Sequence, residues 1–212
     1  PNPAQSVAAF RAGDFDHLYP QSFEIWAQVM ESNPDSVTQV TTPAPSFQPY
    51  IAFRMDQEPF KDARVRQALS LLVDRQAIIK SLAQGMAGQG YGQDWTYFGN
   101  EWPWEEKDLG KYNKYDPAEA KKLPDAANVK NPTFDFLLTQ FAGFNFDVWQ
   151  AVAGMWDAAG VKTVIDAPQD SAKWQSQFYG GTFKHLGATG LIGPGMDPDT
   201  FAYHAMHSKS PK

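Results

Sequence analysis

The chain has 212 residues, a formal net charge of −6 and no cysteine. Disulfides and thiolate metal sites are therefore excluded, and nucleic acid is not an expected partner because no run of Lys and Arg occurs. Hydrophobic residues make up 42% of the sequence and aromatic residues 14%, which is enough for a globular core. No apolar run approaches the ~20 residues of a membrane-spanning helix, and no signal peptide is recognisable.

The first part of the chain is expected to hold two helices and several strands. Pro3 predicts the start of a helix and Gly13 its end. Residues 14–20 then indicate a short strand, and residues 22–32 an amphipathic helix. Two strands are predicted within residues 36–55, with prolines at a sheet edge or joint.

Residues 58–78, EPFKDARVRQALSLLVDRQAI, predict two short helices. Asp62 is a good cap for the first helix and Asp74 for the second, with the break at Val73 and Asp74. Apolar residues fall on one face of each helix. The stretch also holds three arginines that are expected to form scaffold ion pairs with nearby aspartates: Arg64, Arg66 and Arg75.

Residues 85–115 lack periodicity and are rich in glycine and aromatic residues, which is typical of a functional loop. From residue 117 onward, helical and strand patterns alternate. Helices are predicted at 118–123, 146–160, 171–179 and 199–206, and strands at 133–140, 161–167 and 183–192. Pro124 should cut the first of these helices short. The alternation predicts an α/β domain with parallel strand pairing.

No pattern in the chain demands an enzyme. His204 and His207 are three residues apart and could share one helical face, so a metal-binding or hydrolytic α/β domain is the alternative reading. Two ligands are too few for a metal site, and Asp197 and Asp199 are typical of a turn. A pure interaction module is a third reading.

Residues 59–75 carry a specific ordered run: Pro59, Phe60, Asp62, Arg64, Val65, Arg66, Ala68, Leu69, Asp74 and Arg75. This run resembles the signature of the family 5 extracellular solute-binding proteins, the receptors of peptide-, nickel- and oligosaccharide-type ABC importers. The phrases AAFRAGDFDHL, KYDPAEAKKL, GMWDAAGVKTVI and GMDPDTF are similar to phrases of the same family.

The resemblance implies an α/β fold of the type II periplasmic-binding-protein class, a mixed sheet flanked by helices. Residues 1–50 would be a lead-in segment with crossing strands, and residues 51–212 the second ligand-binding lobe of a larger two-lobe receptor. That receptor would be a monomer without a cofactor. It would be periplasmic or extracellular, with a lipid anchor in the full-length protein, and its partners would be a solute and a membrane permease.

The resemblance also implies where the ligand binds. The helix around Trp174 and the end of the strand that follows it match cleft positions of the family, which gives these candidates: Trp174, Gly190, Leu191, Ile192 and Gly193. Peptide-binding members carry an acidic and a basic residue near the positions of Gly187 and Pro194, and neither charge is present here. Ordinary zwitterionic peptides are therefore doubtful ligands, because a buried unpaired charge is costly.

Two further sets of candidates follow from the residue types. The irregular loop offers Tyr91, Gln93 and Trp95, which would suit an oligosaccharide through stacking and neutral hydrogen bonds. Arg54 stands where the family usually has Asn. It would either contact an anionic ligand group or form an ion pair at the hinge.

Overall fold

A computed structural model describes residues 3–18, 23–35, 47–82, 110–130, 132–139 and 145–192. Its strands are β1 (Phe47–Phe53), β2 (Thr133–Leu137), β3 (Lys162–Asp166) and β4 (Leu186–Ile192). Its helices are α1 (Pro3–Ala12), α2 (Phe23–Ser32), α3 (Ala63–Leu71), α4 (Arg75–Leu82), the 3-10 helix η3 (Lys111–Asn113), α5 (Pro117–Ala126), α6 (Asn145–Ala158) and α7 (Ser171–Tyr179). The chain is thus an α/β protein, as its alternating pattern predicts.

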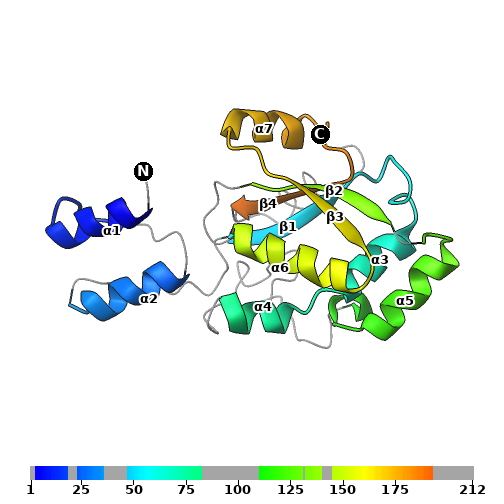
Figure 1. Cartoon of the computed structure of the whole chain (residues 1–212), viewed down its shortest axis with the longest axis horizontal. Coiled ribbons are helices and arrows are strands. Elements are labelled where there is room, and N and C mark those ends of the chain that lie inside the picture. The colour runs from blue at the N-terminus through cyan, green and yellow to red at the C-terminus, as the bar shows by residue number, and fades with distance from the viewer. Residues whose placement is uncertain are drawn as a thin grey trace, which may run out of the picture.

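The four strands form one mixed sheet in the order β1-β4-β2-β3. β2 pairs in parallel with both β3 and β4, whereas β1 runs antiparallel to β4. Figure 1 shows α3, α4, α5 and α6 on one side of this sheet and α7 on the other. Because β2, β3 and β4 are parallel, their carboxyl ends lie at a common edge, called the carboxyl edge below.

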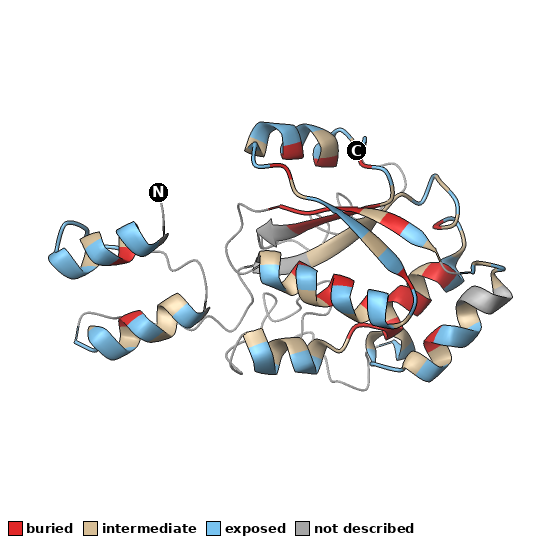
Figure 2. Ribbon diagram, in the orientation of Figure 1, coloured by how far each residue is buried: buried red, intermediate tan, exposed pale blue. Residues whose placement is uncertain are grey.

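The main core lies between the sheet and the helices α3, α5 and α6. Phe136 and Leu186 face this side, and neither has any exposed surface. Trp156 of α6 is 1% exposed, and its indole Nε1 donates a hydrogen bond of 2.9 Å to the Leu69 carbonyl in α3. The buried residues of Figure 2 follow this layer between the helices and the sheet.

Helix caps form where the sequence predicts them. The Asp62 carboxylate accepts a hydrogen bond from the Arg64 amide at 2.8 Å, and the Asp74 carboxylate accepts one from the Ala77 amide at 2.9 Å. The apolar face of α3 is buried, while α4 has no fully buried residue. The helix break at residues 73–74 is also confirmed.

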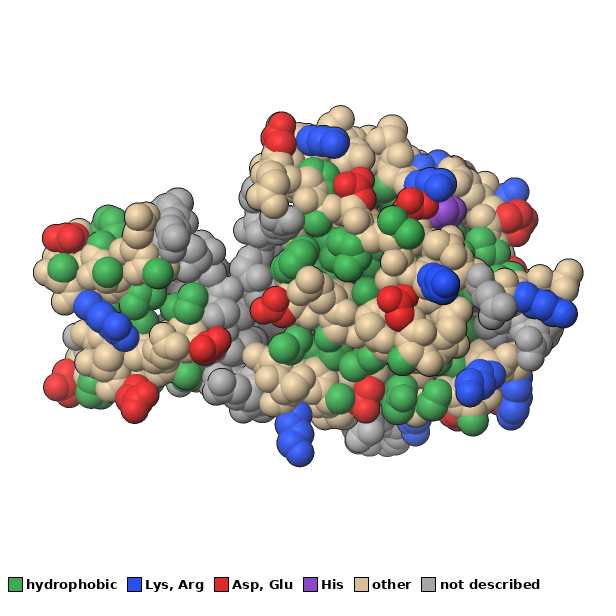
Figure 3. Space-filling model, in the orientation of Figure 1, with side chains coloured by type: hydrophobic (Ala, Val, Ile, Leu, Met, Phe, Trp, Pro, Cys, Tyr) green, Lys and Arg blue, Asp and Glu red, His purple; other side chains and the backbone are tan. Residues whose placement is uncertain are grey.

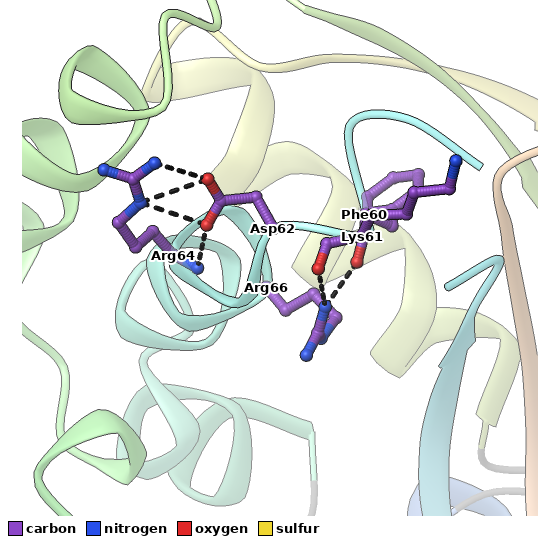
Figure 4. A network of polar contacts seen from close by, with 5 residues as sticks. All are labelled: Phe60, Lys61, Asp62, Arg64 and Arg66. Atoms are coloured by element: carbon purple, nitrogen blue, oxygen red, sulfur yellow. Dashed lines mark hydrogen bonds and ion pairs between the residues drawn. The ribbon is translucent and has the colours of Figure 1, made fainter. Parts of the chain in front are cut away.

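The arginines of this stretch are scaffold residues, although only one of them forms the expected ion pair. Arg64 pairs with Asp62 at 2.6 Å, whereas Arg66 donates to the carbonyls of Phe60 and Lys61 (Figure 4). Arg75 donates to backbone carbonyls instead of a carboxylate, as detailed below. The carbonyls at the end of α3 that Arg75 binds are among the acceptors that a helix C-terminus leaves unsatisfied, and sequence spacing does not reveal that competition.

Two predicted elements are wrong. Residues 14–18 form no strand: Asp14 donates its amide to the Ala9 carbonyl at 2.9 Å to close α1, and residues 14–17 are exposed and pair with no described strand. The helix predicted at 118–123 continues through Pro124 to Ala126. Pro124 removes one intrahelical amide donor, but it lies in the last turn, so few hydrogen bonds follow it, and α5 packs on α3 through the buried Ala120.

α1 and α2 form a helix pair of their own beside the sheet (Figure 1 and Figure 3). Gly13 ends α1 with a φ of +79°, as its position predicts, and Arg11 donates to the Ser32 hydroxyl of α2 at 2.9 Å. None of the described helices is long and apolar enough to cross a membrane. The division at residues 50 and 51 stays a prediction, and β1 spans that point.

Candidate functional site

The carboxyl edge of the sheet brings together the candidates that the structure describes on β4 and α7. Gly190, Leu191 and Ile192 are the last residues of β4, opposite residues 47–49 of β1. Trp174 lies on α7, the helix that enters from the carboxyl end of β3. Gly193 and the loop candidates Tyr91, Gln93 and Trp95 lie outside the described residues, as do His204 and His207.

Trp174 is held in an aromatic cluster between α7 and the sheet. The side chain is 6% exposed, and its ring stacks on Phe178 with centroids 5.1 Å apart and an interplanar angle of 15°. The ring of Phe183 also stacks on Phe178, with centroids 5.6 Å apart, and Leu137 of β2 belongs to the same cluster. This packing fixes the rotamer of Trp174, which a binding residue needs if it is to be preorganised.

The indole N–H of Trp174 has no hydrogen-bond partner among the described residues, although the atom is buried. A buried donor without a partner costs about 1–3 kcal/mol, so such a group calls for an explanation. Trp149 of α6, on the opposite side of the sheet, has the same property. The two tryptophans are therefore a natural pair for comparison.

Gly187 of β4 permits the close approach of α7 to the sheet. A Cβ atom built at this position would lie 2.9 Å from the ring of Phe178, closer than real Cβ contacts. A basic side chain at residue 187, as in the peptide-binding pattern, would therefore collide with the aromatic cluster. The close packing of α7 and the lack of a charged side chain therefore coincide at Gly187.

Neutral polar groups lie near the carboxyl edge, and the sequence alone did not single them out. Thr189 of β4 is 5% exposed and is paired with Tyr50 of β1, while Thr139 follows β2 and is 3% exposed. Burial raises the pKa of Tyr50 to about 12, and nearby Tyr179 adds to the shift. Tyr50 is therefore a neutral hydroxyl at any physiological pH. Strand alternation is the signal that could have placed these residues on the face of α7.

The carboxylates described near this edge are engaged by their own surroundings. Asp166 at the end of β3 accepts a 3.4 Å hydrogen bond from Gln177, and Asp170 caps α7 by accepting from the Ala172 amide at 2.8 Å. Among the described residues, no group of three possible metal ligands occurs.

Arg54 lies at the other end of β4 from Gly190, because it follows Phe53, which pairs with Leu186. Its guanidinium pairs with Asp56 at 2.7 Å and donates to the carbonyls of Gly181 and Phe183 at 2.6 and 2.7 Å. The hydrogen bond with Asp56 raises the pKa of Arg54 further. The structure thus does not bring Arg54 together with the other candidates, and its ligand contact stays a prediction.

Comparison with known proteins places the whole chain in one group. The profile of the family described as "Bacterial extracellular solute-binding proteins, family 5 Middle" matches residues 1–212. A glutathione-binding protein of Pectobacterium atrosepticum is 30% identical over 179 residues, which cover 79% of this chain and 32% of the relative. Heme-binding protein A of Haemophilus influenzae is 30% identical over 171 residues, covering 72% of this chain and 27% of the relative. The chain therefore spans about a third of the length of these curated relatives.

Solved structures of similar fold agree with the predicted fold class. The oligopeptide-binding protein AppA of Bacillus subtilis, in complex with a nonapeptide, covers 100% of this chain with a TM-score of 0.77 and 20% identity, and the match spans 43% of that protein. The protein MoaA in complex with mannopinic acid from A. tumefaciens covers 99% of this chain with a TM-score of 0.73 and 22% identity, over 41% of its own length. At this identity the similarity establishes the fold, a lobe of the type II periplasmic-binding-protein class.

Proposed function

The chain belongs to the bacterial extracellular solute-binding proteins of family 5, and from this we propose that it is one lobe of a receptor that captures a solute outside the cytoplasm. The receptor closes around the solute by a hinge motion and delivers it to the membrane permease of an ABC importer. The relatives named above are binding proteins, in agreement with the expectation of a receptor that is not an enzyme. The full-length protein acts as a monomer and carries a lipid anchor.

The observation that carries the binding role is the carboxyl edge with Trp174. Ligands of open α/β sheets bind beyond the carboxyl ends of the strands. The last residues of β4 and the start of α7 lie at this edge. Trp174 offers a fixed aromatic ring and a buried N–H without a partner among the described residues. Arg54 acts at the hinge through its ion pair with Asp56.

The ligand is an oligopeptide or oligosaccharide that is held through neutral groups on this lobe. Position 187 has no room for a basic side chain, and Pro194 offers no acidic one. The carboxylates of Asp166 and Asp170 near the edge are engaged within the protein, and the neutral polar groups there include hydroxyls and an indole N–H. Such groups bind the hydroxyls and amides of sugars and of end-blocked peptides, whereas a free peptide terminus would stay unpaired here.

A thermal-shift panel on the full-length protein tests the ligand class. The probes are a zwitterionic tripeptide, the same peptide with acetyl and amide ends, and a neutral oligosaccharide. A ligand at 100 times its Kd stabilises the folded state by about 2.7 kcal/mol, which is readily measured as a rise in Tm. We expect the blocked peptide or the oligosaccharide to stabilise more than the zwitterion. A response to the zwitterion alone would contradict neutral recognition while leaving the receptor role intact.

Replacing Trp174 by Phe tests the site itself, because Phe keeps the stacking on Phe178 and removes the N–H. Loss of one hydrogen bond to a ligand, about 1 kcal/mol, should raise the Kd about fivefold. Trp149→Phe is the matched control, since it removes an equally buried and unpartnered N–H from the other side of the sheet. Equal changes of Kd in the two variants, or none in Trp174→Phe, would remove Trp174 from the site.

A further inference from the structure

His185 lies at the corner where β1, β2 and β4 meet. It directly precedes β4, whose first residue, Leu186, pairs with Phe136 of β2 and with Phe53 of β1. The amide of Asp135 in β2 lies one residue before this pairing and donates to the His185 Nδ1 atom at 2.9 Å. The imidazole thus supplies the hydrogen-bond acceptor for the Asp135 amide, because β4 begins only at the next residue, Leu186.

The same Nδ1 atom makes a second contact that requires the opposite protonation state. It lies 2.8 Å from Oδ2 of the Asp135 carboxylate. A neutral imidazole with its proton on Nε2 can accept from the amide, but its Nδ1 lone pair then faces a carboxylate oxygen. An imidazolium can donate to the carboxylate, but it leaves the amide without an acceptor. One atom therefore has two alternative partners on one residue.

The surroundings of the imidazole are partly apolar and partly charged. The side chain is 19% exposed and lies beside the rings of Phe134 and Phe60, at 5.7 and 6.3 Å. The Asp135 carboxylate is shared with Lys184, whose Nζ lies 2.8 Å from it.

The remaining charged groups around this corner have partners of their own. From the end of β1, the Arg54 guanidinium is paired with Asp56, and from the turn that holds Phe60, the Lys61 ammonium lies 3.8 Å from Glu58. Asp135 and Lys184 are therefore the charged groups that face the imidazole from β2 and from its own segment.

We propose that His185 is a proton-controlled latch: the neutral imidazole holds the Asp135 amide, and a proton taken up from solvent at Nδ1 moves this contact to the Asp135 carboxylate and releases the amide. Histidine is the side chain whose ordinary charge change falls between pH 5 and 8, so this is the interval in which the latch is tested.

The latch lies next to the segment that connects α7 with β4. The His185 carbonyl accepts the Arg54 amide at 3.0 Å, and the Arg54 guanidinium binds the carbonyls of Gly181 and Phe183 in the same segment. A change at His185 therefore acts on the anchor of α7, the helix that carries Trp174. This inference stands on the corner geometry and does not depend on the identity of the ligand.

Amide hydrogen exchange of the full-length protein between pH 5 and 8 tests the latch. After correction for the intrinsic pH dependence of exchange, protection of the Asp135 amide should fall about fivefold to tenfold at the acidic end, as expected for the loss of one hydrogen bond. In His185→Gln this pH dependence should disappear. In Asp135→Asn, which keeps the amide and removes the carboxylate, the fall should move to lower pH.

His17→Gln is the control, because His17 is an exposed histidine outside the sheet and its replacement should leave the transition intact. Constant protection of the Asp135 amide across this interval in the unsubstituted protein would overturn the proposal. So would an unchanged transition in His185→Gln. If Asp135→Asn does not fold, the comparison of the unsubstituted protein with His185→Gln decides alone.

Discussion

At the scale of single residues, Gly187 determines how closely α7 packs on the sheet. Replacement by Ala places a Cβ atom 2.9 Å from the Phe178 ring, so the aromatic cluster has to shift. We expect a loss of about 1–3 kcal/mol in the free energy of unfolding, the usual cost of overpacking a core. Urea denaturation of the full-length protein measures it.

Gly154→Ala is the control for this prediction. Gly154 is an exposed residue inside α6, and a Cβ atom there meets nothing within 4 Å. Ala has the higher helix propensity, so this variant should be more stable by up to about 1 kcal/mol. Equal destabilisation by both substitutions would show that the packing of α7 on Gly187 is not the cause.

Asp62 makes the stability of the fold depend on pH. Its pKa is lowered to about 2, mainly by the hydrogen bond from the Arg64 side chain and also by the one from the Arg64 amide. A lowered folded-state pKa means that the carboxylate stabilises the fold fully above its unfolded pKa of ~3.9. That stabilisation is lost as the pH falls through about 2.

Asp62→Asn removes the charge and keeps a good helix cap, whereas Asp62→Ala removes both. Both variants should unfold at lower urea concentration than the unsubstituted protein at pH 7, with Ala the less stable. The difference in the free energy of unfolding between the unsubstituted protein and the Asn variant should become smaller as the pH falls below 4. A difference that stays constant down to pH 2 would show that the ion pair is not its source.

At the scale of elements, Arg75 joins α3, the helix break and η3. Its guanidinium donates to the carbonyls of Ser70, Val73 and Asn113 at 3.2 to 3.4 Å and to the Ser70 hydroxyl at 2.9 Å. Burial lowers its pKa, yet an arginine stays charged, so these acceptors compensate for lost hydration.

Arg75→Met keeps the apolar stem and removes the donors. We expect a loss of about 2 kcal/mol in the free energy of unfolding, because the carbonyls of Ser70, Val73 and Asn113 lose a charged hydrogen-bond donor. Arg64→Met is the matched control: Arg64 is exposed and its pair with Asp62 is a surface ion pair, so its loss should cost less than about 1 kcal/mol. A smaller effect at Arg75 than at Arg64 would contradict a joining role.

The elements also show which parts of the structure the sequence could predict. Caps and helix faces depend on neighbours within a turn, so Asp62 and Asp74 mark helix starts correctly. Contacts between distant segments leave no such signal. Arg54 binds carbonyls 127 and 129 residues away, and His185 meets Asp135 across 50 residues. Three of the acceptors of Arg75 are backbone carbonyls, which have no sequence pattern.

The candidate site was predictable in part for the same reason. The resemblance to a family placed Trp174 and the end of β4 at one edge of the sheet, and the topology places both there. Neither periodicity nor composition shows that Tyr50 and Thr189 are opposite each other, because strand register is set by tertiary pairing. The position of Arg54 at the other end of β4 follows from the antiparallel direction of β1, which the sequence left open.

At the scale of the whole molecule, the chain spans about a third of the length of its curated relatives. In the proposed two-lobe receptor it would therefore supply only part of the ligand contacts. The aromatic cluster and the Arg54 anchor hold α7 against the sheet, so in the proposed receptor motion should concentrate in the strands that connect the two lobes.

Small-angle X-ray scattering of the full-length protein tests this central claim most directly. The measurement compares the radius of gyration without ligand and with a saturating ligand identified by the thermal-shift panel. Closure of two lobes predicts a smaller radius of gyration with ligand, and Trp174→Phe should require more ligand to reach it. A radius that stays the same at full saturation would contradict a receptor that captures its solute by closing.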